Sequence, residues 1–167
     1  MKHSNRLVIE APVEGVIEAL SDLSTYPEWN DLVSNAEPTA EAAEDPGPAW
    51  LTTLTAKVGP FARSKQLRFV RDTFVEHKNP YGDDLTASKI RFTRVEQDGR
   101  DHAAWTMEAT VLEMYNAGSI VTRYATTVTL ELHYDGGLWV PSLGPVVDKA
   151  IERATRRLPN YVREQHR

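Results

Sequence analysis

The last stretch of the chain, residues 141–165, constrains the fold most, because it is the only segment long enough for a helix of about six turns. Its apolar residues recur at steps of three and four, which places them on one stripe of an α-helix. They are Leu143, Val146, Val147, Ala150, Ile151, Ala154, Leu158, Tyr161 and Val162. Pro159 lies inside the segment and predicts a kink near Thr155. Because Ala150 and Ala154 are small, this helix can cover a sheet and leave unfilled space beneath it.

The chain before this helix alternates apolar and polar residues in runs separated by turn signals, the pattern of an antiparallel meander. A first strand is expected at residues 5–11, followed by two short helices that begin near Pro12 and Pro27. About six further strands are expected, at residues 35–39, 50–58, 62–77, 86–96, 102–114 and 120–134. The acidic loop at residues 41–49 is predicted to be mobile. This order predicts one α+β domain over residues 1–167, with its helices on one face of the sheet.

Composition narrows the class of protein. The 167 residues are 41% hydrophobic and 26% charged, as in a soluble globular domain. No apolar run reaches the roughly 18–20 residues that span a bilayer, so no integral membrane segment is expected. The chain has no cysteine, which removes disulfide and thiolate chemistry and fits a cytoplasmic location. The five histidines lack the spacing of a metal site, and neither a metal nor a cofactor is predicted.

The net charge of −5 hides an asymmetry along the chain. No Lys or Arg occurs between Leu7 and Ala56, whereas six basic residues lie between Asp148 and Arg167. The simplest interpretation is that the acidic N-terminal half packs beside the basic last helix. A basic patch for nucleic acid or a membrane is disfavoured, because acids dilute these bases and no aromatic residues are interleaved with them for stacking. No nucleic-acid partner is therefore predicted.

The run from Ile9 to Asn30, IEAPVEGVIEALSDLSTYPEWN, resembles the opening of the START-like (SRPBCC) superfamily, in its polyketide cyclase/dehydrase and lipid-transport branch. The matching positions are Ile9, Ala11, Pro12, Val16, Asp22, Tyr26, Pro27 and Trp29. The run from Tyr134 to Glu164 resembles the terminal strand-to-helix junction and last helix of the same family. The resemblance implies a helix-grip fold, in which a seven-stranded antiparallel sheet curls around the last helix with a cavity between them. Members include hydrophobic-ligand carriers, coenzyme Q-binding proteins and aromatase/cyclases, so the fold alone does not choose among these functions.

The inward faces of the predicted strands and helix define a candidate ligand-binding wall that is mostly apolar, as small-molecule pockets are. Its residues are Trp50, Leu54, Leu67, Phe69, Arg71, Ile90, Phe92, Trp105, Met107, Val111, Tyr124, Val128, Ala150, Ile151 and Ala154. Arg71 is the charged member, and a buried guanidinium needs a partner. That partner could be an anionic ligand or an acid carried by a helix. Alternatively, a bulge turns Arg71 outward, or Arg71 lies at the cavity mouth in contact with water.

The first functional hypothesis is the binding or transport of a hydrophobic small molecule, such as a lipid, a polyketide-like compound or an isoprenoid. The second is a cofactor-independent cyclase or dehydratase of the polyketide aromatase/cyclase type. In that enzyme Arg71 would polarise a substrate carbonyl and Tyr124 would donate a proton. The third is a protein-interaction module with a vestigial cavity. No catalytic residue is assigned, and the ligand and the oligomeric state stay open.

Overall fold

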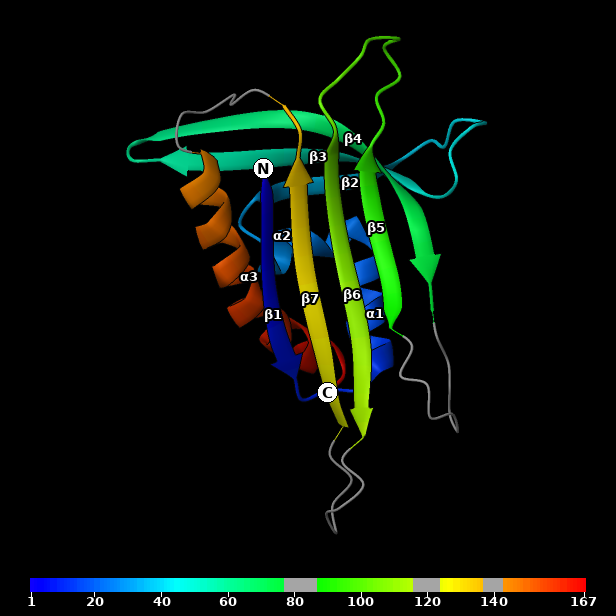
Figure 1. Ribbon diagram of the computed structural model, residues 1–167, viewed down its shortest axis with the longest axis vertical. Helices are drawn as coiled ribbons and strands as arrows, with labels where there is room; N and C mark the ends of the chain where they lie inside the picture. The colour runs from blue at the N-terminus through cyan, green and yellow to red at the C-terminus, as the bar shows by residue number, and fades with distance from the viewer. Residues whose placement is uncertain (77–86, 116–123, 137–142) are drawn as a thin grey trace.

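The computed structural model describes residues 1–76, 87–115, 124–136 and 143–167 (Figure 1). The elements in chain order are β1 (Lys2–Ile9), α1 (Val13–Ser21), the 3₁₀ turn η1 (Leu23–Thr25), α2 (Tyr26–Trp29), β2 (Val33–Thr39), β3 (Ala49–Val58), β4 (Phe61–Val75), β5 (Ser88–Arg94), β6 (Trp105–Tyr115), β7 (Tyr124–Tyr134) and α3 (Leu143–Gln165). Several predicted ends, at residues 77, 86, 120–123 and 141–142, lie outside the described residues.

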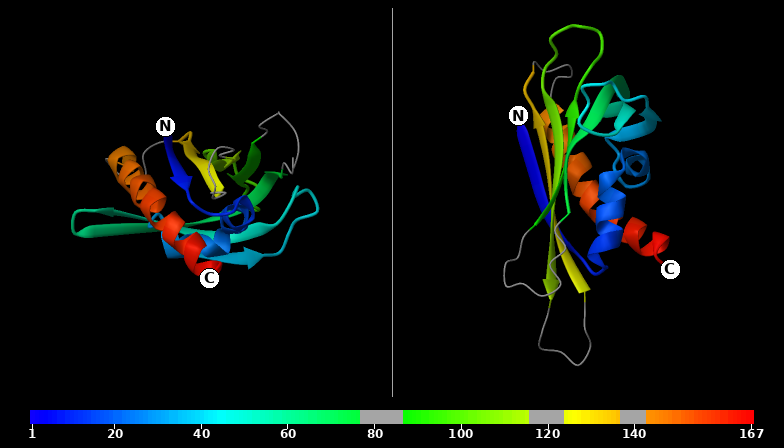
Figure 2. Two further views of the ribbon diagram at one scale, coloured as in Figure 1. Left: turned by 90° about the horizontal axis from the view of Figure 1, so that it is seen from below. Right: turned by 90° about the vertical axis from the view of Figure 1, so that its right-hand side faces the viewer.

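The seven strands form one antiparallel sheet in the order β1-β7-β6-β5-β4-β3-β2. The sheet is curled, and α1 and α3 lie on its concave side (Figure 2). This arrangement confirms the predicted helix-grip fold, with short helices after the first strand and a long helix at the end. The long helix continues through Pro159 to Gln165.

The first strand differs from its predicted bounds, because its pairing with β7 extends from Lys2, opposite His133, to Ile9, opposite Thr126. Glu10 and Ala11 therefore lie outside the strand and lead into α1. Its inward face still carries Leu7 and Ile9, as the alternation predicts.

The core fills the space between the sheet and the helices with large aromatic side chains. Tyr26 and Trp29 of α2 lie with ring centroids 4.3 Å apart, and Phe92 of β5 meets the Tyr26 ring edge-on at 5.9 Å. The ring centroid of Trp50, on β3, lies 5.5 Å from that of Phe92. The Tyr26 hydroxyl donates to the carbonyl of Leu20, and burial raises the pKa of this tyrosine. These aromatic side chains thus form one cluster that joins α2 to the sheet at β3 and β5.

The acidic loop between β2 and β3 is anchored to the sheet, contrary to the mobility predicted for residues 41–49. The guanidinium of Arg68, on the outer face of β4, forms two hydrogen bonds with the carboxylate of Asp45 and donates to the carbonyls of Ala40 and Val95 at 3.1 and 3.2 Å. Gly47 permits this close approach, because a Cβ there would lie 2.5 Å from the carbonyl oxygen of Arg71. A buried ion pair thus holds a segment whose composition resembles that of a free loop.

Candidate functional site

The side chains predicted to line a cavity point to the concave side of the sheet, but they pack against one another. On the strands, ten side chains of this set are each 6% exposed or less: Trp50, Leu54, Leu67, Phe69, Ile90, Phe92, Trp105, Met107, Val111 and Val128. On α3, the buried stripe includes Ala150, Ile151 and Ala154. Their inward placement agrees with the alternation in the sequence, and their role in ligand binding stays a prediction.

The space beneath the middle of α3 is small. Tyr26 and Trp29 of α2, Met107 of β6, and Ile151 and Ala154 of α3 surround about 40 Å³. A volume of that size holds a few water molecules at most, whereas small-molecule sites typically enclose about 300–1,000 Å³. The alanine stripe does leave free volume here, but the aromatic side chains of α2 and the sheet take up most of it.

A larger space lies beside α3, where the N-terminal half of this helix passes the far end of β3. This groove encloses about 680 Å³, which is within the range of small-molecule sites. Its lining residues are Asp31, Thr55, Lys57, Gly59, Pro145, Val146, Lys149, Ala150, Arg153 and Arg157. The floor includes Val146 and the buried Ala150, so that an apolar surface lies between charged walls.

The walls of the groove carry a positive charge. Asp31 is the single acid among the lining residues, and its carboxylate pairs with both Arg153 and Arg157. This contact agrees with the expectation that the acidic N-terminal half packs beside the basic helix. Lys57 and Lys149 are exposed, and neither has an ion-pair partner among the described residues. Two cations therefore flank the apolar floor without a neutralising group of the described chain.

The groove and the small inner space lie on two sides of one contact. Asn30 and, on α3, Ile151 line the inner space. Their neighbours in the chain, Asp31 and Ala150, line the groove. The contact between the turn after α2 and the middle of α3 thus separates the two volumes. The ion pairs of Asp31 with Arg153 and Arg157 lie at this contact.

A sequence model of one protein family matches residues 9–163, and its description is "Polyketide cyclase / dehydrase and lipid transport". The chain belongs to this family. A search of curated proteins finds no match to the chain. Among the matching solved structures is a START superfamily protein from Mycobacterium smegmatis, with 16% sequence identity and a TM-score of 0.56. That match covers 98% of this chain and 95% of the other, and at such low identity it supports the fold alone.

Membership of the polyketide cyclase/dehydrase and lipid transport family supports hydrophobic-ligand binding in general. Among the described residues, no group of three or more His, Asp and Glu side chains is placed to hold a metal ion. Within the same residues, no helix has both the length and the apolar character to cross a membrane.

Arg71, the charged residue of the predicted wall, contacts a helix end. Its Nη1 donates to the carbonyl oxygen of Ser21, the last residue of α1, at 2.9 Å, where the helix dipole favours a cation. Its guanidinium also lies 4.5 Å from the centroid of the Phe74 ring. Burial lowers the pKa of Arg71, opposed by the charge of Asp22. The guanidinium thus has a hydrogen-bond acceptor and a ring contact within the chain, and its role in ligand binding stays a prediction.

The bulge considered for this strand lies one residue further on. The register between β4 and β5 shifts between Arg71 and Thr73, and Asp72 there accepts hydrogen bonds from Arg91 and Thr93, both at 2.7 Å. The side chain of Tyr124, the other residue of the predicted cyclase site, lies outside the described part of the protein. The roles assigned to Arg71 and Tyr124 in the cyclase hypothesis therefore stay predictions.

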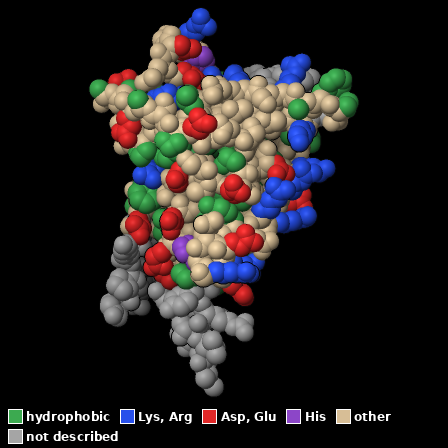
Figure 3. Space-filling view, turned by 180° about the vertical axis from the view of Figure 1, so that it is seen from behind, with side chains coloured by type: hydrophobic (Ala, Val, Ile, Leu, Met, Phe, Trp, Pro, Cys, Tyr) green, Lys and Arg blue, Asp and Glu red, His purple; other side chains and the backbone are tan. Residues whose placement is uncertain are grey.

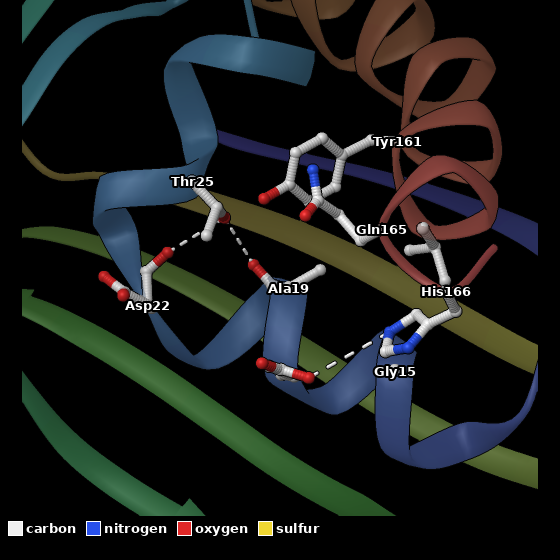
Figure 4. Close-up of a pocket in the computed structure, with 9 residues that line it drawn as sticks. Gly15, Ala19, Asp22, Thr25, Tyr161, Gln165 and His166 are labelled. Carbon is white, nitrogen blue, oxygen red and sulfur yellow. Dashed lines mark hydrogen bonds and ion pairs between the residues drawn. The ribbon is translucent and has the colours of Figure 1, made fainter.

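A second, more acidic pocket lies between α1 and the C-terminal turns of α3 (Figure 4). It encloses about 160 Å³ and is lined by Gly15, Glu18, Ala19, Asp22, Thr25, Tyr161, Val162, Gln165 and His166. Burial and the nearby carboxylates raise the pKa of Tyr161, although a hydrogen bond with Thr25 opposes the shift. Glu18 lies 4.0 Å from His166. This pocket is smaller than the groove, and its two carboxylates make it unsuited to an anion.

Of the residues that line the groove, Ala150 belongs to the predicted ligand-binding wall, whereas the charged residues were missed at the level of sequence. The signal in the sequence is the excess of basic residues between Asp148 and Arg167, which includes Lys149 and Arg153, and Lys57 lies in the strand expected at residues 50–58. These residues meet because the hairpin of β3 and β4 extends past α3 (Figure 1). The alternation of a single strand does not predict such a crossing.

Proposed function

We propose that the protein binds a hydrophobic small molecule with an acidic group in the groove between α3 and β3. The observation that carries the proposal is the apolar floor at Val146 and Ala150 flanked by Lys57 and Lys149. A carboxylate or phosphate there would form charge-assisted hydrogen bonds with the ammonium groups, which are stronger than those between neutral groups. The rest of the molecule would cover the floor and displace water from it. Lipids and polyketide-like or isoprenoid acids have this chemistry.

Family membership supports the hydrophobic part of the proposal, and the groove supports its location and the acidic group. The ligand is placed in the groove because the space that the described residues leave beneath the middle of α3 measures about 40 Å³. A ligand that extended past Ala150 would reach the contact of Asp31 with Arg153 and Arg157. Carrier activity requires no catalytic group, and Lys57 and Lys149 act here only as charge partners.

The proposal is tested by titrating the protein with the fluorescent polyene fatty acid cis-parinaric acid and with its methyl ester. The acid is expected to bind about tenfold more tightly than the ester, because one charge-assisted contact contributes on the order of 1.4 kcal/mol. Replacing Lys149 or Lys57 with glutamine is expected to weaken binding of the acid by a similar factor and to leave binding of the ester unchanged.

Lys89→Gln provides the matched control, since Lys89 lies on β5 away from the groove and pairs with Glu108. This variant loses the same charge and is expected to bind the acid like the wild type. Equal affinity for acid and ester, or an equal loss in all three lysine variants, would contradict the proposed role of the groove.

A further inference from the structure

The hairpin of β3 and β4 projects beyond the rest of the sheet (Figure 1). The first six residues of β4, Phe61–Gln66, are all exposed, and in the sheet they pair only with β3, because pairing with β5 begins at Phe69. We call residues 57–65 the β3–β4 arm. Gly59 has a φ of 59° and lies in its turn, a conformation that favours glycine. The arm is thus a two-stranded ribbon with a tight tip.

The tip of the arm carries an aromatic side chain that is exposed to solvent. Phe61 is 75% exposed, the highest value among the large hydrophobic residues that the structure describes. Arg63 and Lys65 follow it at steps of two, so that all three side chains share one face of β4. One face of the arm therefore combines an apolar tip with two cations behind it.

The charge of the arm is opposite to that of the whole protein. The chain has a net charge of −5, yet between Asp45 and Asp72 it has five basic residues and no acid. Lys57 belongs to the arm and to the groove, whose wall continues the positive charge along α3. From behind, Lys and Arg side chains gather along one edge of the molecule, below the corner where the hairpin ends (Figure 3). A negatively charged surface would be attracted at this corner and repelled elsewhere.

We propose that the β3–β4 arm docks on an anionic phospholipid bilayer. Phe61 would insert at the boundary between headgroups and acyl chains, while Arg63 and Lys65 would contact lipid phosphates and carboxylates. The two cations beside one exposed aromatic side chain fit this interface, because anionic headgroups attract basic residues near the surface while the ring enters the boundary below them. Docking would also bring the open end of the groove, at Lys57 and Gly59, next to the bilayer. The inference goes beyond the proposed function, because it concerns a surface outside the groove.

The test is co-sedimentation of the full chain with vesicles of phosphatidylcholine, with and without phosphatidylserine. The wild type is expected to bind the anionic vesicles and not the neutral ones, and to lose binding as salt is raised. Phe61→Ser and the double variant Arg63→Gln/Lys65→Gln are each expected to bind the anionic vesicles at least tenfold more weakly than the wild type. Phe61→Trp, which keeps an aromatic side chain, should retain binding. Val8→Ser is the matched control, because Val8 is another exposed hydrophobic residue, on β1.

Three results would overturn the inference. The first is equal binding to neutral and anionic vesicles, and the second is unchanged binding in Phe61→Ser. The third is a dimer in sedimentation velocity that Phe61→Ser abolishes, which would assign the arm to a second copy of the chain. Phe61, Arg63 and Lys65 do not line the groove, so their variants should bind cis-parinaric acid in solution like the wild type. Failure of docking is thereby distinguishable from failure of the groove.

Discussion

Replacing Asp45 with alanine is expected to lower the free energy of unfolding by about 3–5 kcal/mol, because it leaves a buried guanidinium without its counter-ion. The side chains of Asp45 and Arg68 are only 1% and 4% exposed. After the substitution Arg68 would keep the carbonyls of Ala40 and Val95 and lose both carboxylate oxygens. The loop between β2 and β3 would also lose its anchor to β4. Denaturant unfolding at neutral pH measures the effect directly.

The pH dependence of a second variant, Asp45→Asn, provides an independent check. The hydrogen bond from Arg68 lowers the pKa of Asp45 below its ordinary value, although burial opposes the shift. The ion pair therefore contributes its full stability above the unfolded-state pKa of about 3.9 and loses it as the pH falls through the folded-state value. The difference in stability between the wild type and Asp45→Asn should shrink progressively below about pH 4.

Glu152→Ala is the control for this experiment, since Glu152 forms an exposed ion pair with Arg156 on α3. Exposed pairs of this kind contribute about 0–1 kcal/mol. A loss in Asp45→Ala no larger than that of Glu152→Ala would show that the loop is not anchored by this pair. A difference that stays constant down to low pH would contradict the assigned role of the carboxylate.

Substitution by leucine is expected to have different consequences at Ala154 and at Ala150, two alanines one turn apart on α3. Ala154 is 1% exposed and borders the inner space of about 40 Å³, so Ala154→Leu is expected to overpack the core and destabilise the fold by about 1–3 kcal/mol. Ala150 is 7% exposed and borders the groove, so Ala150→Leu is expected to cost less stability than Ala154→Leu, because the longer side chain can extend into the groove. It should, however, weaken binding of cis-parinaric acid by about tenfold or more, since the new side chain occupies the floor.

Thermal unfolding and the fatty-acid titration together separate these outcomes. If the Ala154→Leu variant keeps wild-type stability and no longer binds cis-parinaric acid, the ligand binds between the sheet and α3. If Ala150→Leu unfolds, the floor of the groove has no spare volume. Either result would move the binding site away from the groove.

The fold could be predicted from the sequence because its elements follow simple periods. The stripe of Leu143, Val147, Ile151, Leu158 and Val162 has helical spacing and is buried in α3. The strands alternate with the period of two that a sheet with one covered face requires. Strand ends do not follow from these periods, since β1 is defined by the length of its pairing with β7 rather than by its own composition.

The candidate site could be predicted only in part, because it depends on packing and on contacts between distant segments. Whether the grip contains a cavity is decided by how Trp29, Phe92 and Trp105 fill it, and the alternation of residues does not specify side-chain volume between layers. The pairing of Asp45 with Arg68 joins a loop to the outer face of a strand 23 residues away. Local patterns do not predict such pairs.

The most direct test of the central claim is to locate the bound ligand by photo-crosslinking. A fatty acid with a diazirine in its chain is bound, irradiated and mapped by peptide mass spectrometry, with cis-parinaric acid as competitor. The groove predicts competed adducts within residues 145–153 of α3 and 55–59 around the end of β3. Adducts confined to Trp105, Met107, Ala109 and Val111, on the inward face of β6, would place the ligand between the sheet and α3 and contradict the proposed site.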